Sequence, residues 1–232
     1  MTAENQILAA LSADVYDRLA PHLDWVTFEQ GAMIHTPGEL LSHLYFPIDC
    51  LFSITITMQN GATAEVGMVG NREVLGINAI MGNSETTQTE YGIQCPGSAL
   101  KIKAHVVRQE FDRNGELHNV LLRYTQAFLA QVSQTAACNS LHTLEQRLPR
   151  WLLETQERIN ADRLPLTQEF IATMLGVRRA GVTQMAQKLQ ERQLIQYRRG
   201  NVQILNQAGL EASACECFKR IKAEYDRLLG KK

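Results

Sequence analysis

The sequence predicts an α+β protein with an N-terminal antiparallel β domain, one long helix and a C-terminal winged helix-turn-helix. Strand-like runs separated by turn residues fill the first half, a sustained helical periodicity follows, and two short helical segments precede a hairpin-like stretch. With 232 residues and 45% hydrophobic content, the chain can bury the cores of two modest domains. We divide it into residues 1–116, 117–142 and 143–232.

The N-terminal segment and the cysteines indicate where the chain works. Residues 1–20 resemble an acidic amphipathic helix rather than a signal peptide, and no apolar run approaches the ~18 residues of a membrane span. The five cysteines are odd in number and scattered, which is typical of reduced thiols rather than of a disulfide framework. We therefore expect a cytoplasmic protein with no membrane partner.

Residues 26–102 have the pattern of an antiparallel all-β domain. Short apolar or alternating runs are separated by turn clusters, and this spacing predicts a barrel or jelly-roll. The strand-like runs include Leu44–Phe46, Leu51–Met58, Ala64–Val69 and Ala99–Ile102. Asn60-Gly61 lies between two of them and is a strong hairpin signal, because both residues tolerate the positive φ of a tight turn.

A long helix is predicted from Leu117 to His142. Its apolar residues recur at spacings of three and four, which suits a seam with a partner helix. To this dimer interface we assign Leu121, Tyr124, Phe128, Val132 and Cys138. A second stripe consists of Leu122, Leu129 and Ala136, and the alternative is a helix buried within one protomer. A break is expected near Leu148-Pro149, followed by a helix from Trp151 to Ile159.

The segment from Thr167 to Ile195 predicts two short helices joined by a glycine turn. Thr167 suits a helix N-cap, and Gly176 can end the first helix because glycine readily takes the left-handed conformation. The second helix has one apolar face. Its other face carries cations and side-chain hydrogen bonders without a carboxylate, namely Arg178, Arg179, Thr183, Gln184, Gln187 and Lys188.

This composition favours binding to double-stranded DNA. The second helix of a helix-turn-helix lies in the major groove, where arginine can pair with guanine, glutamine can pair with adenine, and lysine neutralises phosphate. A hairpin with Arg198 and Arg199 at its tip follows, as in a winged helix. The net charge of −1 divides into −7 for Met1–His142 and +6 for Thr143–Lys232, so positive charge accompanies the helix-turn-helix.

The run from Leu166 to Leu205 resembles the C-terminal domain of the Crp/Fnr transcription regulators, and a looser similarity extends from about Leu11 to Leu229. The resemblance implies a β-roll sensor domain of the cyclic-nucleotide-binding type, a central dimerisation helix, a homodimer on a palindromic operator and a contact with RNA polymerase. It places near DNA the residues Thr167, Gln168, Arg178, Arg179, Thr183, Gln184, Lys188, Arg198 and Arg199.

The recognition helix departs from the family pattern at three positions, one of which is Arg178, where the family usually has serine near a phosphate. Arg179 matches the family arginine that contacts a guanine. Ala180 stands where the family often has glutamate, and Gln184 replaces a second arginine. The resemblance therefore implies an operator that differs from the common Crp site.

By resemblance, an effector pocket is expected between Val74 and Tyr91. Nucleotide-binding family members carry an acidic residue after the glycine and an arginine for the cyclic phosphate. The corresponding residues here are Gly76, Ile77, Asn78, Thr86, Thr87 and Gln88. Because a phosphate buried without a cation is costly, cAMP and cGMP are not expected, and Arg72 is read as a solvated turn residue.

No other cofactor is predicted, although haem or another small effector stays open. An iron–sulfur cluster is disfavoured because no cysteine precedes Cys50, where family members carry most of their cluster ligands. Conceivable haem ligands are His35, His43, His105, His118 and His142, and conceivable redox thiols are Cys50, Cys95 and Cys138. Cys215 and Cys217 are read as packing residues, without a metal, because residues two apart on a helix point to different sides.

We do not predict an enzyme. The sequence contains no phosphate-cradling glycine loop, no recognisable metal box and no nucleophile elbow. The alternative to a DNA-binding regulator is an effector-binding or protein-interaction module that has lost specific DNA readout. Ala180 and the missing phosphate cassette motivate that alternative, whereas the basic residues of the second helix and the hairpin argue against it.

Overall fold

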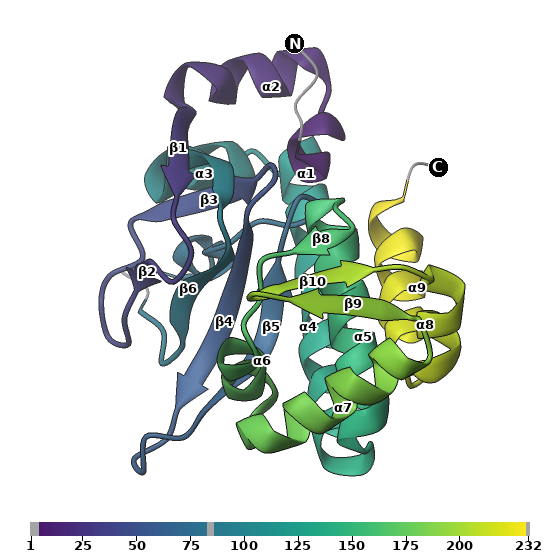
Figure 1. Cartoon of the computed structure of the whole chain (residues 1–232). Helices are drawn as coiled ribbons and strands as arrows, with labels where there is room; N and C mark the ends of the chain where they lie inside the picture. Colours follow the sequence, from purple (N-terminus) through teal and green to yellow (C-terminus); the bar gives the residue numbers. More distant parts are fainter. Residues whose placement is uncertain (1–4, 83–85, 231–232) are drawn as a thin grey trace.

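The computed structural model describes residues 5–82 and 86–230 and confirms the predicted α+β architecture (Figure 1). The chain begins with α1 (Gln6–Ala9), α2 (Ala13–Leu19) and the 3₁₀ turn η1 (Ala20–His22). Ser12 separates α1 from α2, so the single N-terminal helix predicted from the sequence is divided in two. Residues 1–4 of that prediction lie outside the described chain.

Two antiparallel sheets form the N-terminal β-roll. One has the strand order β1 (Asp24–Phe28), β7 (Gly97–Lys103) and β3 (His43–Pro47). The other has the order β2 (Met33–His35), β6 (Glu90–Cys95), β4 (Leu51–Thr57) and β5 (Thr63–Val69). The rings of Phe28 and Phe52, one from each sheet, lie 5.5 Å apart, so the two sheets enclose a common core.

The hairpin predicted at Asn60-Gly61 is confirmed between β4 and β5. Thr57 pairs with Thr63 at its end, and Gly61 has φ +81°. The N–H of Ala62 donates to Asn60 Oδ1 over 3.0 Å, which stabilises the turn. Strand β6, which the sequence pattern did not single out, lies between β2 and β4.

After the 3₁₀ turn η2 (Ile77–Ile80) and helix α3 (Ala104–Phe111), helix α4 runs from Glu116 to Leu141. The break predicted at Leu148-Pro149 is wrong, because α5 (Leu144–Ile159) continues through Pro149. The interruption lies instead at His142-Thr143. Thr143 and Gln146 form a capping box there, which satisfies free N–H groups at the start of α5.

The C-terminal part is a winged helix followed by two further helices. It contains β8 (Arg163–Leu164), α6 (Gln168–Leu175), α7 (Arg179–Glu191), β9 (Ile195–Arg198), β10 (Asn201–Ile204), α8 (Gln207–Ser213) and α9 (Cys217–Leu229). Helix α9 lies antiparallel along α4, because Cys215 meets Cys138 near one end and the carbonyl of Leu228 accepts from Arg123 near the other (Figure 1).

The β-roll and the winged helix pack directly against each other. Leu51 and Met68 from the β-roll share one buried cluster with Trp151, Leu152 and Leu175. This common core fixes the position of the winged helix relative to the sheets. Within the described residues, no helix is both long and apolar enough to cross a membrane.

Candidate nucleic-acid interface

Helices α6 and α7 form the predicted helix-turn-helix. Thr167 caps α6, because the N–H of Phe170 donates to its Oγ1 over 3.1 Å. Gly176 ends α6 in the left-handed conformation, and its N–H is shared by the carbonyls of Ala172 and Thr173. Helix α7 then begins at Arg179.

The two faces of α7 separate as the sequence predicted. Val182, Ala186 and Leu189 are buried in the C-terminal core, which holds the helix in place. The opposite face is exposed and presents Arg178, Arg179, Thr183, Gln184, Gln187 and Lys188. Thr183 Oγ1 donates to Gln168 Oε1 over 2.6 Å, so the helix pair is also joined on its outer side.

Two cations of this face have weak partners within the protein. Arg179 lies 3.8 Å from Glu169, and Lys188 lies 3.1 Å from Glu145, with all four side chains well exposed. Exposed pairs of this kind contribute little net free energy. Both cations can therefore exchange a carboxylate for a base edge or a phosphate at low cost.

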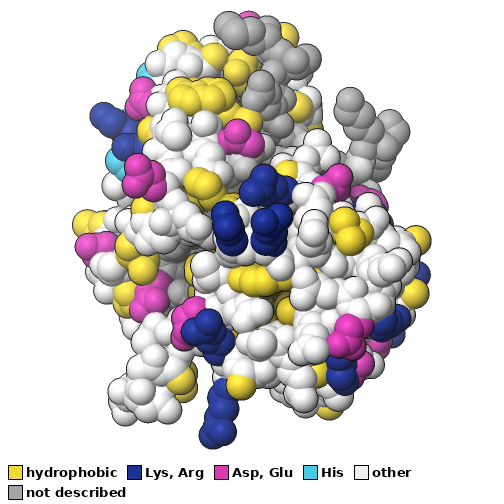
Figure 2. Space-filling model, viewed as in Figure 1, with side chains coloured by type: hydrophobic (Ala, Val, Ile, Leu, Met, Phe, Trp, Pro, Cys, Tyr) yellow, Lys and Arg dark blue, Asp and Glu magenta, His cyan; other side chains and the backbone are white. Residues whose placement is uncertain are grey.

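The wing adds a second basic surface. Strands β8, β10 and β9 form a small sheet whose outer face is a groove lined by Arg163, Gln196, Arg198, Arg199, Asn201 and Gln203. Figure 2 shows basic side chains gathered over this wing groove, with further basic side chains below it over the helix-turn-helix. Arg163 was missed from the sequence because the pairing of β8 with β10 brings it to the wing.

The proposed dimer residues of α4 are largely internal. Leu121 and Tyr124 are buried in the protomer, and Tyr124 Oη donates to the carbonyl of Val74 over 2.8 Å. Cys138 is fully buried against the C-terminal helices, and the Phe128 ring packs against Gly67 of β5. Leu121, Tyr124 and Cys138 are therefore covered within the protomer and are not available to a partner helix. Val132 is half-buried on the same helix.

The six predicted pocket residues divide between two places. Gly76 begins the 3₁₀ turn with φ +86°, and an added Cβ would lie 2.7 Å from the carbonyl oxygen of His43. Ile77 is buried beside it, and Asn78 is half-buried. Residues 83–85 lie outside the described chain. Thr86 and Gln88, which follow them in the sequence, are exposed, and Thr87 Oγ1 hydrogen-bonds Thr89 Oγ1.

A small cavity of the β-roll adjoins both segments, because its lining residue His43 contacts Gly76 and its lining residue Leu40 pairs with Thr86. Its lining includes His35, Ser42, His43, Tyr45 and Tyr91. Burial lowers the pKa of both histidines, so they are neutral at pH 7. The cavity therefore presents neutral polar groups rather than the cation that a cyclic phosphate needs.

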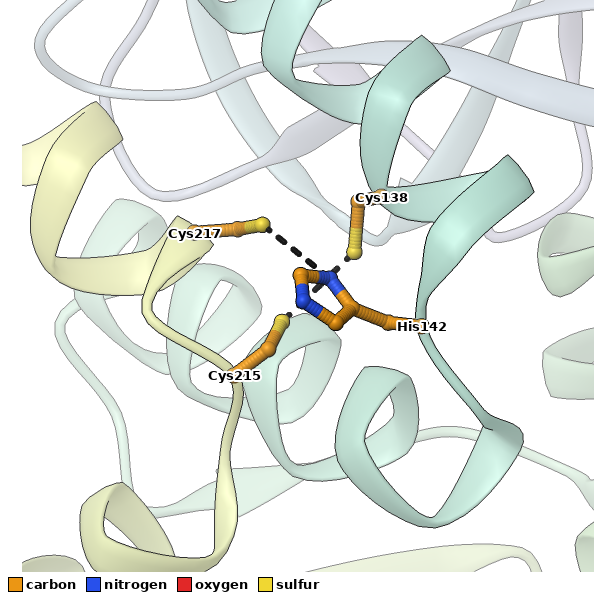
Figure 3. Close-up of side chains that lie close together, drawn as sticks. All are labelled: Cys138, His142, Cys215 and Cys217. Carbon is orange, nitrogen blue, oxygen red and sulfur yellow. Dashed lines mark hydrogen bonds between the residues drawn. The ribbon is translucent and has the colours of Figure 1, made fainter.

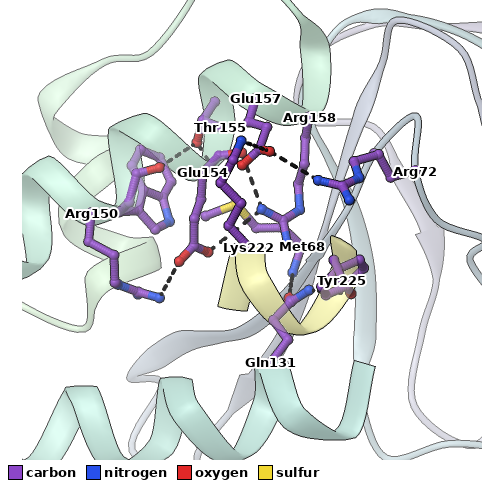
Figure 4. A network of polar contacts seen from close by, with 12 residues as sticks. Met68, Arg72, Gln131, Arg150, Glu154, Thr155, Glu157, Arg158, Lys222 and Tyr225 are labelled. Atoms are coloured by element: carbon purple, nitrogen blue, oxygen red, sulfur yellow. Dashed lines mark hydrogen bonds and ion pairs between the residues drawn. The ribbon is translucent and has the colours of Figure 1, made fainter. Parts of the chain in front are cut away.

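Arg72 is not the solvated turn residue that the sequence suggested. Its side chain is only 13% exposed and pairs with Glu157 of α5 over 3.0 Å and with Asp226 of α9 over 2.5 Å. Arg158 of α5 reaches Glu73 of the β-roll over 3.0 Å, with both groups buried. These ion pairs join the β-roll, α5 and α9 by charge as well as by apolar packing, and Figure 4 labels Arg72, Glu157 and Arg158 among them.

The five cysteines fall into two environments. Burial raises the pKa of Cys50 and of Cys95 to about 12, so neither is a reactive thiolate at neutral pH. The other three, Cys138, Cys215 and Cys217, meet His142 between α4 and the start of α9 (Figure 3). The helix argument against a shared site fails, because Cys215 precedes α9 and has non-helical backbone.

An exposed basic helix, α7, and an arginine-lined wing lie in one C-terminal unit whose core packs against the β-roll, and together they define a winged helix-turn-helix. Residues 146–213 match the model of the Crp-like helix-turn-helix domain. The chain is also 22% identical over 178 residues to the global nitrogen regulator of Nostoc sp. (strain PCC 7120), covering 73% of this chain and 79% of that one. Residues 146–213 therefore carry a Crp-like helix-turn-helix domain, and the similarity to a known regulator extends over most of the chain.

Solved structures share the fold across most of the chain. FixK2 from Bradyrhizobium japonicum superposes with a TM-score of 0.71 at 13% identity, covering 83% of this chain and 98% of that one. A CRP-family transcriptional regulator from Thermus thermophilus gives 0.67 at 18% identity, covering 82% and 96%. The c-di-GMP-responsive regulator CLP from Xanthomonas campestris gives 0.63 at 18% identity, covering 83% and 99%.

Proposed function

We propose that the protein binds a palindromic DNA operator as a homodimer and regulates transcription there. The observation that carries this proposal is the exposed face of α7, which has no carboxylate from Arg178 to Lys188 and lies in the same domain as the wing groove. Such a surface matches the major groove and its flanking phosphates.

The side chains of this surface fall into groups that suit base edges, phosphates or the minor groove. Arg179 and Gln184 are exposed on α7 and suit the edges of guanine and adenine, whereas Ala180 offers only a methyl group. Thr167, Gln168, Arg178, Thr183 and Lys188 suit phosphate or base edges near the helix ends. The arginines of the wing groove suit the DNA backbone or minor groove, where they add affinity without reading each base.

The dimer is proposed from the second apolar stripe of α4. Leu122 and Leu129 are 51% and 61% exposed, one heptad apart, and Ala136 continues the stripe one heptad further. A parallel two-fold pairing along this stripe would place two recognition helices about 34 Å apart on one side of the DNA. A regulator at a promoter would also contact RNA polymerase.

Regulation through the β-roll would use an effector other than cAMP or cGMP. Thr86, Thr87 and Gln88 supply hydroxyl and amide groups at the place where nucleotide-binding relatives have an arginine. These neutral groups compensate an anionic phosphate poorly.

Paired substitutions test the DNA interface. Binding of full-length protein to a selected operator and to a shuffled duplex would be measured by fluorescence anisotropy across a salt series. Arg179→Ala should cost about 1–3 kcal/mol on the operator and relax the preference at one base position. Arg199→Ala should weaken both duplexes alike and reduce the salt slope by about one per protomer.

Lys103→Ala is the matched control, because it removes an exposed cation at the end of β7, outside the winged helix. It should leave both affinities unchanged. Equal losses for Arg179→Ala on operator and shuffled DNA would contradict the assignment of α7 as the recognition helix. They would favour a module without specific readout.

A further inference from the structure

Four metal-ligating side chains converge between α4 and the α8–α9 connection. Cys138 lies near the end of α4, His142 follows one turn later, and Cys215 and Cys217 flank the start of α9. Their ligand atoms all lie within 4.8 Å of one another (Figure 3). We propose that this Cys₃His cluster binds one zinc ion.

The spacing of the donor atoms fits a single tetrahedral ion. Cys138 Sγ lies 3.5 Å from Cys215 Sγ, and Cys217 Sγ lies 3.5 Å from His142 Nδ1. Zinc bonds of about 2.3 Å to sulfur and about 2.0–2.1 Å to nitrogen place neighbouring donors about 3.5–3.8 Å apart. The four side chains therefore need little movement to close around the ion.

The histidine is oriented as a metal ligand requires. Its Nδ1 faces Cys217, and its Nε2 lies 3.3 Å from Glu216 Oε2. A carboxylate that accepts from the far nitrogen of a ligating imidazole fixes its tautomer and its ring orientation. Gln134 Nε2 donates to Cys217 Sγ over 3.1 Å and would stabilise the thiolate in the same way.

Burial and charge also favour a metal. The three cysteines are at most 5% exposed and form a cluster of their own, separate from the large apolar cores. Three thiolates around Zn²⁺ leave one net negative charge, which would be costly if uncompensated. The buried guanidinium groups of Arg147 and Arg150 both interact electrostatically with Cys138 and Cys215, and Arg147 adds positive charge beyond the Arg150–Glu154 ion pair.

The donor set distinguishes zinc from two other uses of these thiols. A disulfide between Cys138 and Cys215 would leave Cys217 and His142 converging without a role. An iron–sulfur cluster would spread its ligands over two or more irons and hold them farther apart. Four protein donors without an open position are typical of structural zinc, and thiolate–imidazole donors select it over magnesium or calcium.

Such a site would clamp the C-terminal end of α4 to the α8–α9 connection. Cys138 and His142 come from the end of α4 and its C-cap, whereas Cys215 lies in the connection and Cys217 is the first residue of α9. Metal binding would therefore hold α8 and α9 against α4. This proposal rests on the geometry of the cluster and stands independently of DNA binding.

Cobalt substitution tests the proposal directly. Reduced full-length protein would be freed of metal by chelation and titrated anaerobically with Co²⁺ and then with Zn²⁺. The expected result is one Co²⁺ per chain, with intense tetrahedral ligand-field bands and a thiolate-to-cobalt charge-transfer band that Zn²⁺ abolishes. Cys215→Ser should weaken metal binding by more than about 100-fold, and Glu216→Gln should weaken it by about 10–100-fold.

Cys50→Ala is the matched control, because it removes a buried thiol outside the cluster and should keep the wild-type spectrum and affinity. The Glu216→Gln variant keeps all four ligands. A weaker metal affinity in this variant therefore cannot be explained by a missing ligand or by misfolding of the kind that Cys215→Ser could cause. Failure of the reduced wild type to bind Co²⁺ tetrahedrally would overturn the proposal. So would isolation of the chain with an iron–sulfur chromophore, or equal losses for Cys50→Ala and Cys215→Ser.

Discussion

Glu65 is a carboxyl group buried at the contact between β5 and α5. Its Oε1 accepts from Trp151 Nε1 over 2.8 Å, and its side chain lies near Arg150, Glu154 and Arg158. Burial raises the pKa of Glu65 to about 8, so the folded protein holds this proton at neutral pH. A polar group of this kind makes the contact between the β-roll and α5 sensitive to pH.

Glu65→Gln should remove that sensitivity. The pKa of Glu65 is higher in the folded than in the unfolded state. The contribution of protonated Glu65 to the free energy of unfolding is therefore complete below about pH 4.5 and is lost as pH rises through about 8. The variant should gain relative stability by about 1.4 kcal/mol per pH unit across that window, measured by urea unfolding. Glu29→Gln, at an exposed carboxylate, should show no such trend. If the difference in the free energy of unfolding between Glu65→Gln and the wild type stays constant with pH, this prediction is wrong.

At the scale of elements, α4 uses its two apolar stripes for different contacts. The stripe containing Leu121 and Tyr124 packs inside the protomer, and the stripe containing Leu122 and Leu129 remains exposed. The exposed stripe is therefore the surface that a partner helix can cover.

Leu129→Glu should convert the dimer to a monomer, because a carboxylate at the seam would be buried against its own two-fold copy. Sedimentation equilibrium measures this, with circular dichroism to show that the fold is kept. Leu40→Glu, at another exposed leucine in the β-roll, should remain dimeric. A Leu129→Glu protein that stays dimeric would place the interface elsewhere.

Local signals in the sequence predicted most elements of the fold. Asn60-Gly61 marked the β4–β5 hairpin, and Thr167 with Gly176 marked the limits of α6. The predicted break at Pro149 is wrong. A proline removes one helical hydrogen bond, but α5 is largely buried around Pro149, and this packing stabilises the helix despite the lost bond. The break was signalled instead by the capping box at Thr143, which the apolar periodicity of the region obscured.

The candidate sites differ in how far the sequence could predict them. The proposed DNA-binding face lies within one continuous segment, so the spacing, the charge distribution and the family resemblance could predict it from the sequence. The Cys₃His cluster depends on α9 lying antiparallel along α4, which brings together residues more than 70 positions apart. No local pattern encodes that packing, and the same packing hides Leu121 and Tyr124 from a partner.

At the scale of the whole molecule, buried charges connect the β-roll with the C-terminal helices. Arg158 contacts Glu73 and Glu154, and its guanidinium lies 5.7 Å from the centre of the Tyr225 ring of α9. This one buried arginine therefore ties three parts of the chain together.

Arg158→Ala should lower the free energy of unfolding by about 3–5 kcal/mol, because it leaves Glu73 and Glu154 buried with a lost partner. Arg227→Ala removes an arginine paired with Glu224 on the surface of α9 and should cost no more than about 1 kcal/mol. Urea unfolding of both variants measures the difference. If both variants lose a similarly small free energy of unfolding, the buried network does not hold the β-roll and the helices together.

We propose that two copies of this chain bind one palindromic operator. Selection of DNA from a random pool with purified full-length protein, repeated at two salt concentrations, is the first test of this proposal. An enriched palindrome with half-site centres about one helical turn apart is expected, with stronger discrimination at the higher salt. Salt-sensitive binding without any enriched sequence would contradict it.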